Sequence, residues 1–467
     1  MNKKISQILL TMGLLTLAAP AFATDLMDIY NQSAESDQVF QAAKYTRLAN
    51  REALPQSIAN LLPNLSATAN TTYTKYDTVS ERGFSPNSPF IGSLTPLGYL
   101  DYNSNGYTIT LSQPIIAPIN WMQVSAASST AKQADATLGA AAQDLMIRVA
   151  TAYFTVLQSQ DNLRYTQAEK AAYGKQLDQE QQRFKVGLDA ITSVYNAQAS
   201  YDGAVASEIA AENSLRDSLE ALRQLTGAFY PNIEGFKMGL PLLTPMPADV
   251  ERWVAASDEQ NLTLMAQRFA VLAARAQVKV NFSGHLPTLN AVGTYSNNAG
   301  QNFGTTTTHV TTGALQLNVP IFQGGLITSQ TREAEDKYGT AAANMENTRR
   351  QVEVATRQQF NNVLSGISQV KADLQAIVSA QSSMDSTEES FKVGTRTIVD
   401  VLLAQNTFYQ AKFNYARDEY TYLLSTLQLK QAAGTLTTSD LQIINSWLHA
   451  PAPQKKRHKE PSPNPSP

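Results

Sequence analysis

The chain of 467 residues contains no cysteine and only four histidines. Without thiols it can form no disulfide, thiolate metal site or cysteine nucleophile. The histidines show no spacing that is typical of a metal site, and the sequence has no phosphate-binding loop and no nucleophile elbow. We therefore expect neither an enzyme nor a protein with a bound metal or cofactor.

Charged residues are scarce as well, at 16% of the chain, and the net charge is −3. This balance argues against a nucleic-acid partner and against a polybasic membrane-surface binder. Beyond the N-terminal segment, no stretch approaches the roughly 20 consecutive apolar residues of a transmembrane helix. A mature chain that crosses a membrane would therefore have to do so as a closed β-barrel.

The first 23 residues are organised like a secretory signal peptide. Two lysines near the start precede an apolar run over residues 8–17, and the small residues Ala21 and Ala23 precede Thr24. We expect residues 1–23 to be removed on export and the mature chain to begin at Thr24.

The stretch from Pro320 to Gly434 has the pattern of one long helical hairpin. Its seam residues recur at alternating spacings of three and four, which places them on one face of a helix. A first helix over 325–391 would be roughly 100 Å long, and Gly394 can supply the left-handed residue that ends it. The seam comprises Phe360, Val363, Ile367, Val370, Leu374, Ile377, Gln381, Met384, Glu388 and Phe391 in the first helix and Val401, Ala404, Phe408, Ala411, Tyr415, Asp418, Tyr422, Ser425, Leu429 and Ala432 in the second.

The same hairpin occurs earlier in the chain, over predicted helices 118–186 and 189–226. Phe184-Lys185-Val186-Gly187 matches Phe391-Lys392-Val393-Gly394 at an offset of 207 (391 − 184). Upstream, Leu62-Pro63 matches Leu286-Pro287 at an offset of 224 (287 − 63). Two matching copies of this length indicate a duplicated architecture.

Each copy also contains a predicted helix, over 25–61 and 249–284, followed by two strands in which apolar and uncharged polar residues alternate. The strands are joined by predicted loops over 78–105 and 297–310. The alternation fits barrel strands with lipid on one side and water on the other. It equally fits a half-buried antiparallel sheet, but the export signal and the duplication favour the barrel.

One chain supplies only four strands, whereas about eight are needed to close a barrel. We therefore predict an α+β membrane protein that oligomerises, and a trimer would supply twelve strands and a cylinder of helices. The predicted organisation is a signal peptide 1–23, a first repeat 24–227, a linker 228–248, a second repeat 249–434, a C-terminal segment 435–450 and a basic, proline-rich, disordered tail 451–467.

Two other classes of protein share some of these features. A periplasmic adaptor would contain one coiled-coil hairpin with lipoyl-like or barrel domains, rather than two matched hairpins with strand pairs. A specific porin would consist mainly of strands, whereas helix dominates the pattern here.

The most specific motif is Val393-Gly394-Thr395-Arg396-Thr397-Ile398-Val399-Asp400-Val401-Leu402. Supporting motifs are Phe184-x-Val186-Gly187-Leu188, His285-Leu286-Pro287 and Pro320-Ile321-x-Gln323-Gly324-Gly325. In these motifs, and over the mature chain to about residue 447, the sequence resembles the outer-membrane efflux factor family.

The resemblance implies a homotrimer in the cell outer membrane that extends into the periplasm. Its twelve-stranded β-barrel would continue into a long α-helical coiled-coil barrel. It implies an exit duct for drug efflux and type I protein secretion. Such a duct docks on a periplasmic adaptor, or membrane fusion protein, and on an inner-membrane transporter of the RND, ABC or MFS class.

The resemblance also implies roles for the turns between the long helices. Asp400 matches an acidic constriction, where three copies around the axis would attract cations. Leu403 replaces the family's second acid, so we expect a weaker cation trap. The residues that match the adaptor-docking grooves are Val186, Gly187, Leu188, Val393, Gly394 and Thr395. Gly187 and Gly394 also suit a simpler role as helix C-caps.

The resemblance also implies a gate, in which Arg396 bonds to a neighbouring coil and keeps the channel closed. Ser193 and Phe391 replace an acid and a tyrosine of the family's network. Asp189 lies four residues before Ser193, on the same helix face. We hypothesise that it replaces the missing acid as the partner of Arg396; alternatively, it only caps its helix. The expected gate network comprises Gln182, Asp189, Thr192, Ser193, Phe391 and Arg396.

Overall fold

The computed structural model describes residues 24–76, 100–236, 239–300 and 306–449. The predicted signal peptide 1–23 and the predicted tail 451–467 lie outside these residues. The chain divides into two compact units, one built from Met1–Tyr45, Thr137–Leu264 and Arg349–Pro467, the other from Thr46–Ala136 and Met265–Thr348. Each unit draws on both sequence repeats, and the predicted repeat boundaries stay a prediction.

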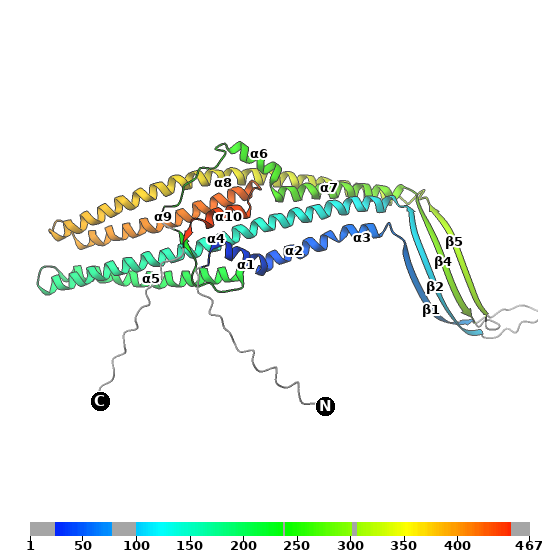
Figure 1. The fold of residues 1–467 in the computed structure, drawn as a ribbon, viewed down its shortest axis with the longest axis horizontal. Helices are drawn as coiled ribbons and strands as arrows, with labels where there is room; N and C mark the ends of the chain where they lie inside the picture. Colours follow the sequence, from blue (N-terminus) through cyan, green and yellow to red (C-terminus); the bar gives the residue numbers. More distant parts are fainter. Residues whose placement is uncertain (1–23, 77–99, 237–238, 301–305, 450–467) are drawn as a thin grey trace, which may run out of the picture. The chain divides into compact units, whose positions relative to one another are not determined.

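The second unit contains a four-stranded antiparallel sheet (Figure 1). Its strands are β1 (Asn64–Tyr76), β2 (Leu100–Ile116), β4 (Thr288–Gly300) and β5 (Thr306–Asn318). The order is β1-β2-β4-β5, so the inner strands β2 and β4 come from different repeats and pair with each other. The duplication therefore produces one sheet, and β1 and β5 form its two edges.

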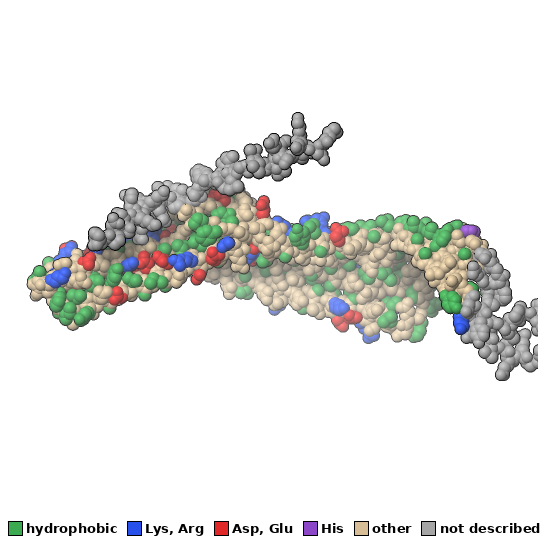
Figure 2. Space-filling view, turned by 90° about the horizontal axis from the view of Figure 1, so that it is seen from below, with side chains coloured by type: hydrophobic (Ala, Val, Ile, Leu, Met, Phe, Trp, Pro, Cys, Tyr) green, Lys and Arg blue, Asp and Glu red, His purple; other side chains and the backbone are tan. Residues whose placement is uncertain are grey.

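One face of this sheet is apolar and exposed. Leu65 of β1 pairs with Leu111 of β2, and the exposed fractions of Leu65 and Leu315 are 70% and 73%. The four strands contain only two charged residues, Lys75 and Asp101. Figure 2 accordingly shows mostly hydrophobic and uncharged side chains around the strands. Such a surface requires an apolar covering.

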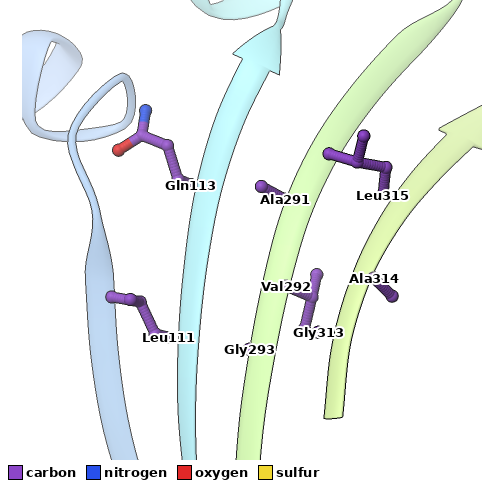
Figure 3. A pocket seen from close by; sticks show the side chains of 8 residues that line it. All are labelled: Leu111, Gln113, Ala291, Val292, Gly293, Gly313, Ala314 and Leu315. Carbon is purple, nitrogen blue, oxygen red and sulfur yellow. The ribbon is translucent and has the colours of Figure 1, made fainter.

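Small residues shape the middle of the apolar face. Gly293 of β4 pairs with Gly313 of β5, and the side chains of Leu111 and Leu315 flank this glycine pair (Figure 3). The opposite face is polar, and there the hydroxyl groups of Thr294 and Thr312 contact each other across the same two strands. The sheet is thus two-faced, as the alternation in the sequence predicts.

Two helical hairpins dominate the described residues. The first consists of α4 (Pro118–Lys185) and α5 (Ile191–Thr226), the second of α8 (Leu326–Lys392) and α9 (Ile398–Ala432). At about 1.5 Å per residue, the 68 residues of α4 and the 67 of α8 each span roughly 100 Å. Within the described ranges, no helix combines the length and the apolar character needed to cross a membrane.

The first unit has a hydrophobic core to which both hairpins contribute. The ring of Phe154 in α4 stacks on that of Tyr420 in α9, with centroids 6.2 Å apart. Phe236, in the short strand β3 (Gly235–Phe236), contacts both rings. Leu145, Val149 and Val156, which lie at heptad spacings along α4, are fully buried. Burial of this kind, rather than helix propensity, holds long helices together.

The helices predicted over 25–61 and 249–284 are interrupted. The first is α1 (Leu26–Ser36), α2 (Gln38–Arg51) and α3 (Ala53–Ala59); the second is α6 (Val250–Gln260), α7 (Leu262–Phe282) and a 3₁₀ turn, η1 (Ser283–His285). Asp37 and Asn261 mark equivalent breaks at the repeat offset of 224 (261 − 37), with ψ of 115° and 119°. Their side chains accept hydrogen bonds from the N–H groups of Phe40 (2.7 Å) and Leu264 (3.0 Å). Each therefore caps the helix that follows.

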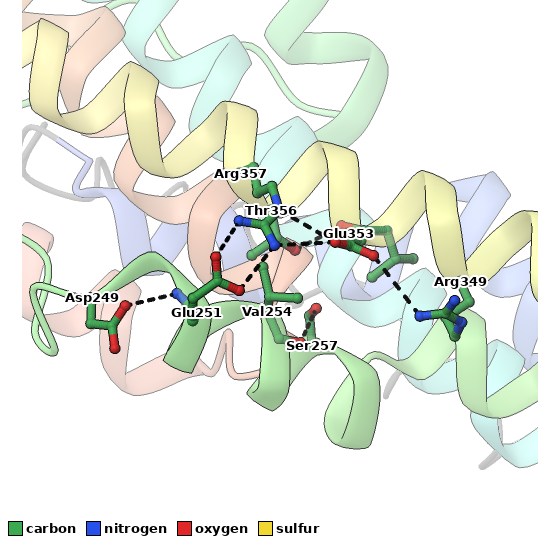
Figure 4. A network of polar contacts seen from close by, with 9 residues as sticks. Asp249, Glu251, Val254, Ser257, Arg349, Glu353, Thr356 and Arg357 are labelled. Carbon is green, nitrogen blue, oxygen red and sulfur yellow. Dashed lines mark hydrogen bonds and ion pairs between the residues drawn. The ribbon is translucent and has the colours of Figure 1, made fainter.

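The remaining short elements connect the hairpins. β3 pairs with β6 (Leu448–His449), and α10 (Thr438–Asn445) begins with a capping box. Arg357 of α8 binds both carboxylate oxygens of Glu251 in α6 (2.6 and 2.9 Å) and also contacts Glu353 (Figure 4). This exposed network fixes the side of α8 on which α6 lies.

The strands are longer than the sequence predicted. Loops were expected over 78–105 and 297–310, but β2 already begins at Leu100, β4 reaches Gly300 and β5 begins at Thr306. Tyr73, for example, pairs with Asn103. The serine, threonine and asparagine content of these segments reflects an uncharged strand surface rather than loops. The rest of the predicted loops, 78–99 and 301–305, lies outside the described residues.

The predicted seam of α8 departs from the structure at Leu374, and it resumes at Ile377, which packs against the core. Phe360, Val363, Ile367 and Val370 are buried, but Leu374 is 50% exposed. Asp373 takes the buried position instead, where its carboxyl group faces that of Asp418 in α9. The contact line of the helices therefore passes through a polar pair that the hydrophobic pattern does not reveal.

Candidate functional site

The turns between the long helices, residues 186–190 and 393–397, share one backbone conformation and one pattern of hydrogen bonds. The N–H groups of Gly187 and Leu188 donate to carbonyl groups three and five residues earlier, at 3.0 and 2.9 Å. Gly394 and Thr395 repeat both bonds at the same distances. The φ angles of the two glycines are +77° and +79°. This arrangement ends a helix with a left-handed residue, so the glycines are required by the turns themselves.

Both turns expose apolar side chains. The exposed fractions of Val186, Leu188 and Val393 are 69%, 70% and 76%. The structure thus places all six residues predicted to dock an adaptor on these two turns, beside accessible glycine backbone. Docking itself stays a prediction.

The second turn is closed by a capping box. Thr397 donates from its N–H and its hydroxyl group to Oδ2 of Asp400, both at 2.9 Å, and the Asp400 N–H donates back to the Thr397 hydroxyl oxygen. These bonds, with the positive charge of Arg396, lower the pKa of Asp400. Its carboxylate therefore stays ionised at neutral pH, while Leu403, three residues further on, is 65% exposed and uncharged.

The first turn uses a different set of contacts, centred on Asp189. Its Oδ1 accepts from the Ala190 N–H (2.8 Å) and the Ser193 hydroxyl group (2.7 Å), and its Oδ2 accepts from Nε of Arg183 (3.3 Å). The N-cap of α5 is Ala190, which has no side-chain cap. Within one chain the partner of Asp189 is thus Arg183. The hypothesised bond to Arg396, which is exposed, stays a prediction.

A second carboxyl group lies beneath Asp189. Glu180 is fully buried, and Nε2 of Gln176 donates to its Oε1 (3.1 Å). Its Oε2 has no donor among the described residues. Burial and the neighbouring Asp189 raise the pKa of Glu180. Although partial burial opposes it, the bonds from Ser193 and Ala190 lower the pKa of Asp189. When this pair holds one proton, that proton therefore resides on Glu180.

Arg183 also contacts the other hairpin. Its guanidinium carbon lies 5.0 Å from the centroid of the Phe391 ring, near the end of α8. Sequence reasoning missed Arg183 and Glu180. One available signal was the repeat itself, because the residue before the shared phenylalanine is Arg183 in the first copy and Ser390 in the second.

Behind the turns, the start of α9 packs on the first hairpin. Ile398, Val401 and Leu402 form a buried cluster with Tyr173 of α4 and Ala204 of α5. The Tyr173 hydroxyl group approaches the Leu402 carbonyl oxygen at 3.4 Å. The two hairpins of one chain are therefore held together just behind their turns.

The other predicted gate residues are not joined within a single chain. Gln182 and Thr192 are exposed, like Arg396. In the part of the chain that the structure describes, no hydrogen bond or ion pair links these three residues to one another. A gate network between neighbouring chains stays a prediction.

Comparison with known proteins gives matches over almost the whole chain. The model of the family described as outer membrane efflux protein matches residues 29–228 and 253–435, one segment in each repeat. Outer membrane protein TolC of Vibrio cholerae is 37% identical over 451 residues, which cover 96% of this chain and 99% of that protein. The proteases secretion protein PrtF of Dickeya chrysanthemi is 27% identical, with 95% of both chains covered.

The fold is matched by solved structures. The outer membrane protein VceC of Vibrio cholerae superposes with a TM-score of 0.73 at 20% sequence identity, and the match covers 88% of this chain and 96% of that one. The hairpins and the strand pairs described above are thus one known architecture.

Proposed function

Because the chain belongs to the outer membrane efflux protein family, we propose that it forms an outer-membrane exit duct for efflux and type I secretion. Its relatives are channel proteins that work with efflux and secretion machinery, and one is named for protease secretion. The two alternatives, a periplasmic adaptor and a specific porin, are not favoured, because helical hairpins and a strand quartet occur together here.

The observation that carries the proposal is the unfinished sheet. Four strands expose an apolar face, and both edge strands, β1 and β5, have one unpaired side within this sheet. In lipid, unpaired backbone groups are too costly to persist. Pairing β5 of one chain with β1 of the next removes every edge, and three chains give the twelve strands of a closed barrel. A homotrimer is therefore part of the proposal.

The lumen follows from the faces of the sheet. The apolar face would contact outer-membrane lipid, and the polar face, with Thr294 and Thr312, would line a water-filled passage. Three pairs of hairpins would continue this passage into the periplasm. The duct would be passive, and its energy would come from the inner-membrane partner.

The turns would then form the periplasmic mouth. The exposed side chains of Val186, Leu188 and Val393 offer apolar contacts to the hairpin tips of a periplasmic adaptor. An RND, ABC or MFS transporter in the inner membrane would deliver cargo through the adaptor. Specificity for cargo would reside in that transporter, since this lumen offers mainly uncharged polar groups.

A constriction and a gate would lie just inside the mouth. Three copies of Asp400 would form an ionised ring that attracts cations. Leu403 would leave this ring without a second layer of acids. Arg396 of one chain would bond to Asp189, Thr192 or Ser193 of its neighbour and so hold the mouth shut.

Deletion of the gene, with two assays run in parallel, tests the proposal. The strain should become sensitive to toxic compounds, should lose secretion of a type I protein substrate, or both. Expression of the wild-type chain should restore whichever is lost. A deletion strain that is unchanged in both assays, in a cell with no second duct of this family, would contradict the proposed function.

A further inference from the structure

We propose that Arg183 is the clasp that joins the two hairpins of one chain at the mouth, by holding Phe391 of α8 from the end of α4. The inference rests on the proposed function, because the clasp is assigned to closing the duct. It adds a gate residue that acts within each chain, in addition to contacts between chains.

The clasp is a cation held between an anion and a ring. Nε of Arg183 donates to Oδ2 of Asp189 in its own turn at 3.3 Å. The guanidinium carbon lies 5.0 Å from the ring centroid of Phe391 in the other hairpin. The Arg183 side chain is 35% exposed, so water screens the contact only in part. Attraction between a cation and a ring face strengthens as both lose water.

The first turn fixes the position of Arg183 before Phe391 takes part. Oδ1 of Asp189 is engaged by the Ala190 N–H and the Ser193 hydroxyl group, which leaves Oδ2 for Arg183. Beneath it, the buried Glu180 accepts from Gln176 on one oxygen only. The anion that orients the guanidinium group is thus held rigidly by its own hairpin.

The clasp lies closer to the turns than the other described bonds between the hairpins. Tyr173 reaches the Leu402 carbonyl oxygen, and Asn406 donates to Glu169 at 3.3 Å, both further back along α4 and α9. The Phe391 ring also packs against the edge of the buried cluster of Tyr173, Ala204, Ile398, Val401 and Leu402. Breaking its contact with Arg183 would therefore free the ends of the hairpins while the buried members of that cluster stay in place. That is the movement a mouth requires when it opens.

The residue types are specific for this contact. Ser390 stands at the position of Arg183 in the second repeat, so each chain carries one clasp and a trimer carries three. A planar guanidinium group can lie flat on a ring while its edge donates hydrogen bonds, and a lysine cannot do both. Phe391 offers the ring without a hydroxyl group, so the contact depends on the ring face alone.

Single-channel recording from the full-length protein in planar lipid bilayers, without an adaptor, tests the clasp. Arg183→Gln and Phe391→Leu should each raise the ratio of open to closed states by roughly 3- to 30-fold, the range of a cation–ring contact. Arg183→Lys should open the channel less than Arg183→Gln. Phe391→Tyr keeps the ring and should open the channel less than Phe391→Leu. Lys185→Gln, on the exposed end of the same helix, is the matched control and should change nothing.

The double variant separates a clasp from a general loss of structure. If Arg183 acts through Phe391, the variant with both changes should be no more open than either single variant, and all variants should unfold at the temperature of the wild type. Two outcomes would contradict the clasp and leave the proposed function standing. In one, the effects of the two substitutions on the ratio of open to closed states multiply in the double variant; in the other, the Arg183→Gln channel stays as closed as the wild type. A wild-type chain that forms no channel would overturn the proposed function and the clasp with it.

Discussion

The carboxyl group of Glu180 lies against that of Asp189 at the end of the first hairpin, one buried and the other bound to Arg183. The second hairpin contains a similar pair, Asp373 and Asp418. In both, a glutamine four residues earlier donates to one oxygen of the buried acid, whose other oxygen has no donor among the described residues. An arginine binds the second acid. Each pair retains one proton more readily than two separate acids would.

The pair at the mouth predicts a pH dependence. The pKa of Glu180 is raised above its ordinary 4.5, so its protonated form contributes stability below that value, and this is lost as the pH rises through the raised pKa. The lowered pKa of Asp189 has the opposite sign, and its contribution is lost only as the pH falls through that lower value. The contribution of Glu180 to thermal stability should therefore decline as the pH rises above 4.5 through its raised pKa.

Glu180→Gln removes this titration, so its unfolding temperature should fall less steeply over this pH interval than that of the wild type, while Asp373, whose pKa is also raised, still contributes its share. Glu389→Gln, at an acid that is exposed and paired with Lys392, is the matched control and should keep the wild-type profile. Unfolding temperatures measured across a pH series decide the matter. A Glu180→Gln variant that declines as steeply as the wild type would contradict the assignment of the proton to Glu180.

A glycine in a turn and a glycine inside a helix should respond in opposite directions to substitution by alanine. Gly187→Ala forces a side chain into a backbone with φ of +77° and should lower the free energy of unfolding by about 1–2 kcal/mol. Gly203→Ala in α5, where an added Cβ meets nothing within 4 Å, should raise it by about 0.5–1 kcal/mol. Denaturant unfolding compares the two variants. Equal effects would show that the turn backbone imposes no requirement for glycine.

The constriction predicts how trivalent cations block the channel. Asp400→Asn keeps an oxygen that can accept from Thr397 but removes the charge, so block should weaken while the helix cap remains. Leu403→Asp adds a second acid to each chain, and block should strengthen. The measurement is the concentration of a trivalent cation that halves the current through a planar bilayer. Unchanged block in Asp400→Asn would mean that Asp400 does not line the narrow part of the pore.

The break in the N-terminal helix predicts a graded loss of stability. Arg148 binds both oxygens of the buried Asp37 at 2.9 and 3.0 Å, and these bonds lower the pKa of that carboxyl group. Asp37→Ala removes the cap and leaves Arg148 without this partner, a loss of about 2–3 kcal/mol. Asp37→Asn keeps a capping oxygen and should lose less. Equal losses in denaturant unfolding would show that the cap contributes nothing.

The stability that Asp37 contributes should also depend on pH. Because its pKa is lowered in the folded chain, the contribution is complete above the ordinary aspartate value of 3.8 and is lost as the pH falls through the lowered value. The difference in the free energy of unfolding between Asp37→Ala and the wild type should therefore become smaller at acid pH. A difference that stays constant over that interval would contradict the role of the ion pair.

The hydrophobic periodicity was sufficient to predict the long hairpins. Apolar residues at three- and four-residue spacing indicate helices, and the glycines between them indicate where each helix ends and the chain turns. The periodicity failed at Asp37 and Asn261, since nothing local distinguishes an aspartate or asparagine within a helix from one that caps the next. The strand ends were missed because an uncharged strand has the composition of a loop. The contact between Arg183 and Phe391 joins residues 208 positions apart (391 − 183), and no local pattern encodes such a contact.

The central claim is that β1 and β5 find their missing partners in other copies of the same chain. The most direct test is the mass of the protein extracted from outer membranes in mild detergent, together with its conductance in a planar bilayer. We predict a particle of three chains that forms one ion-conducting pore. A water-soluble monomer without conductance would contradict the account.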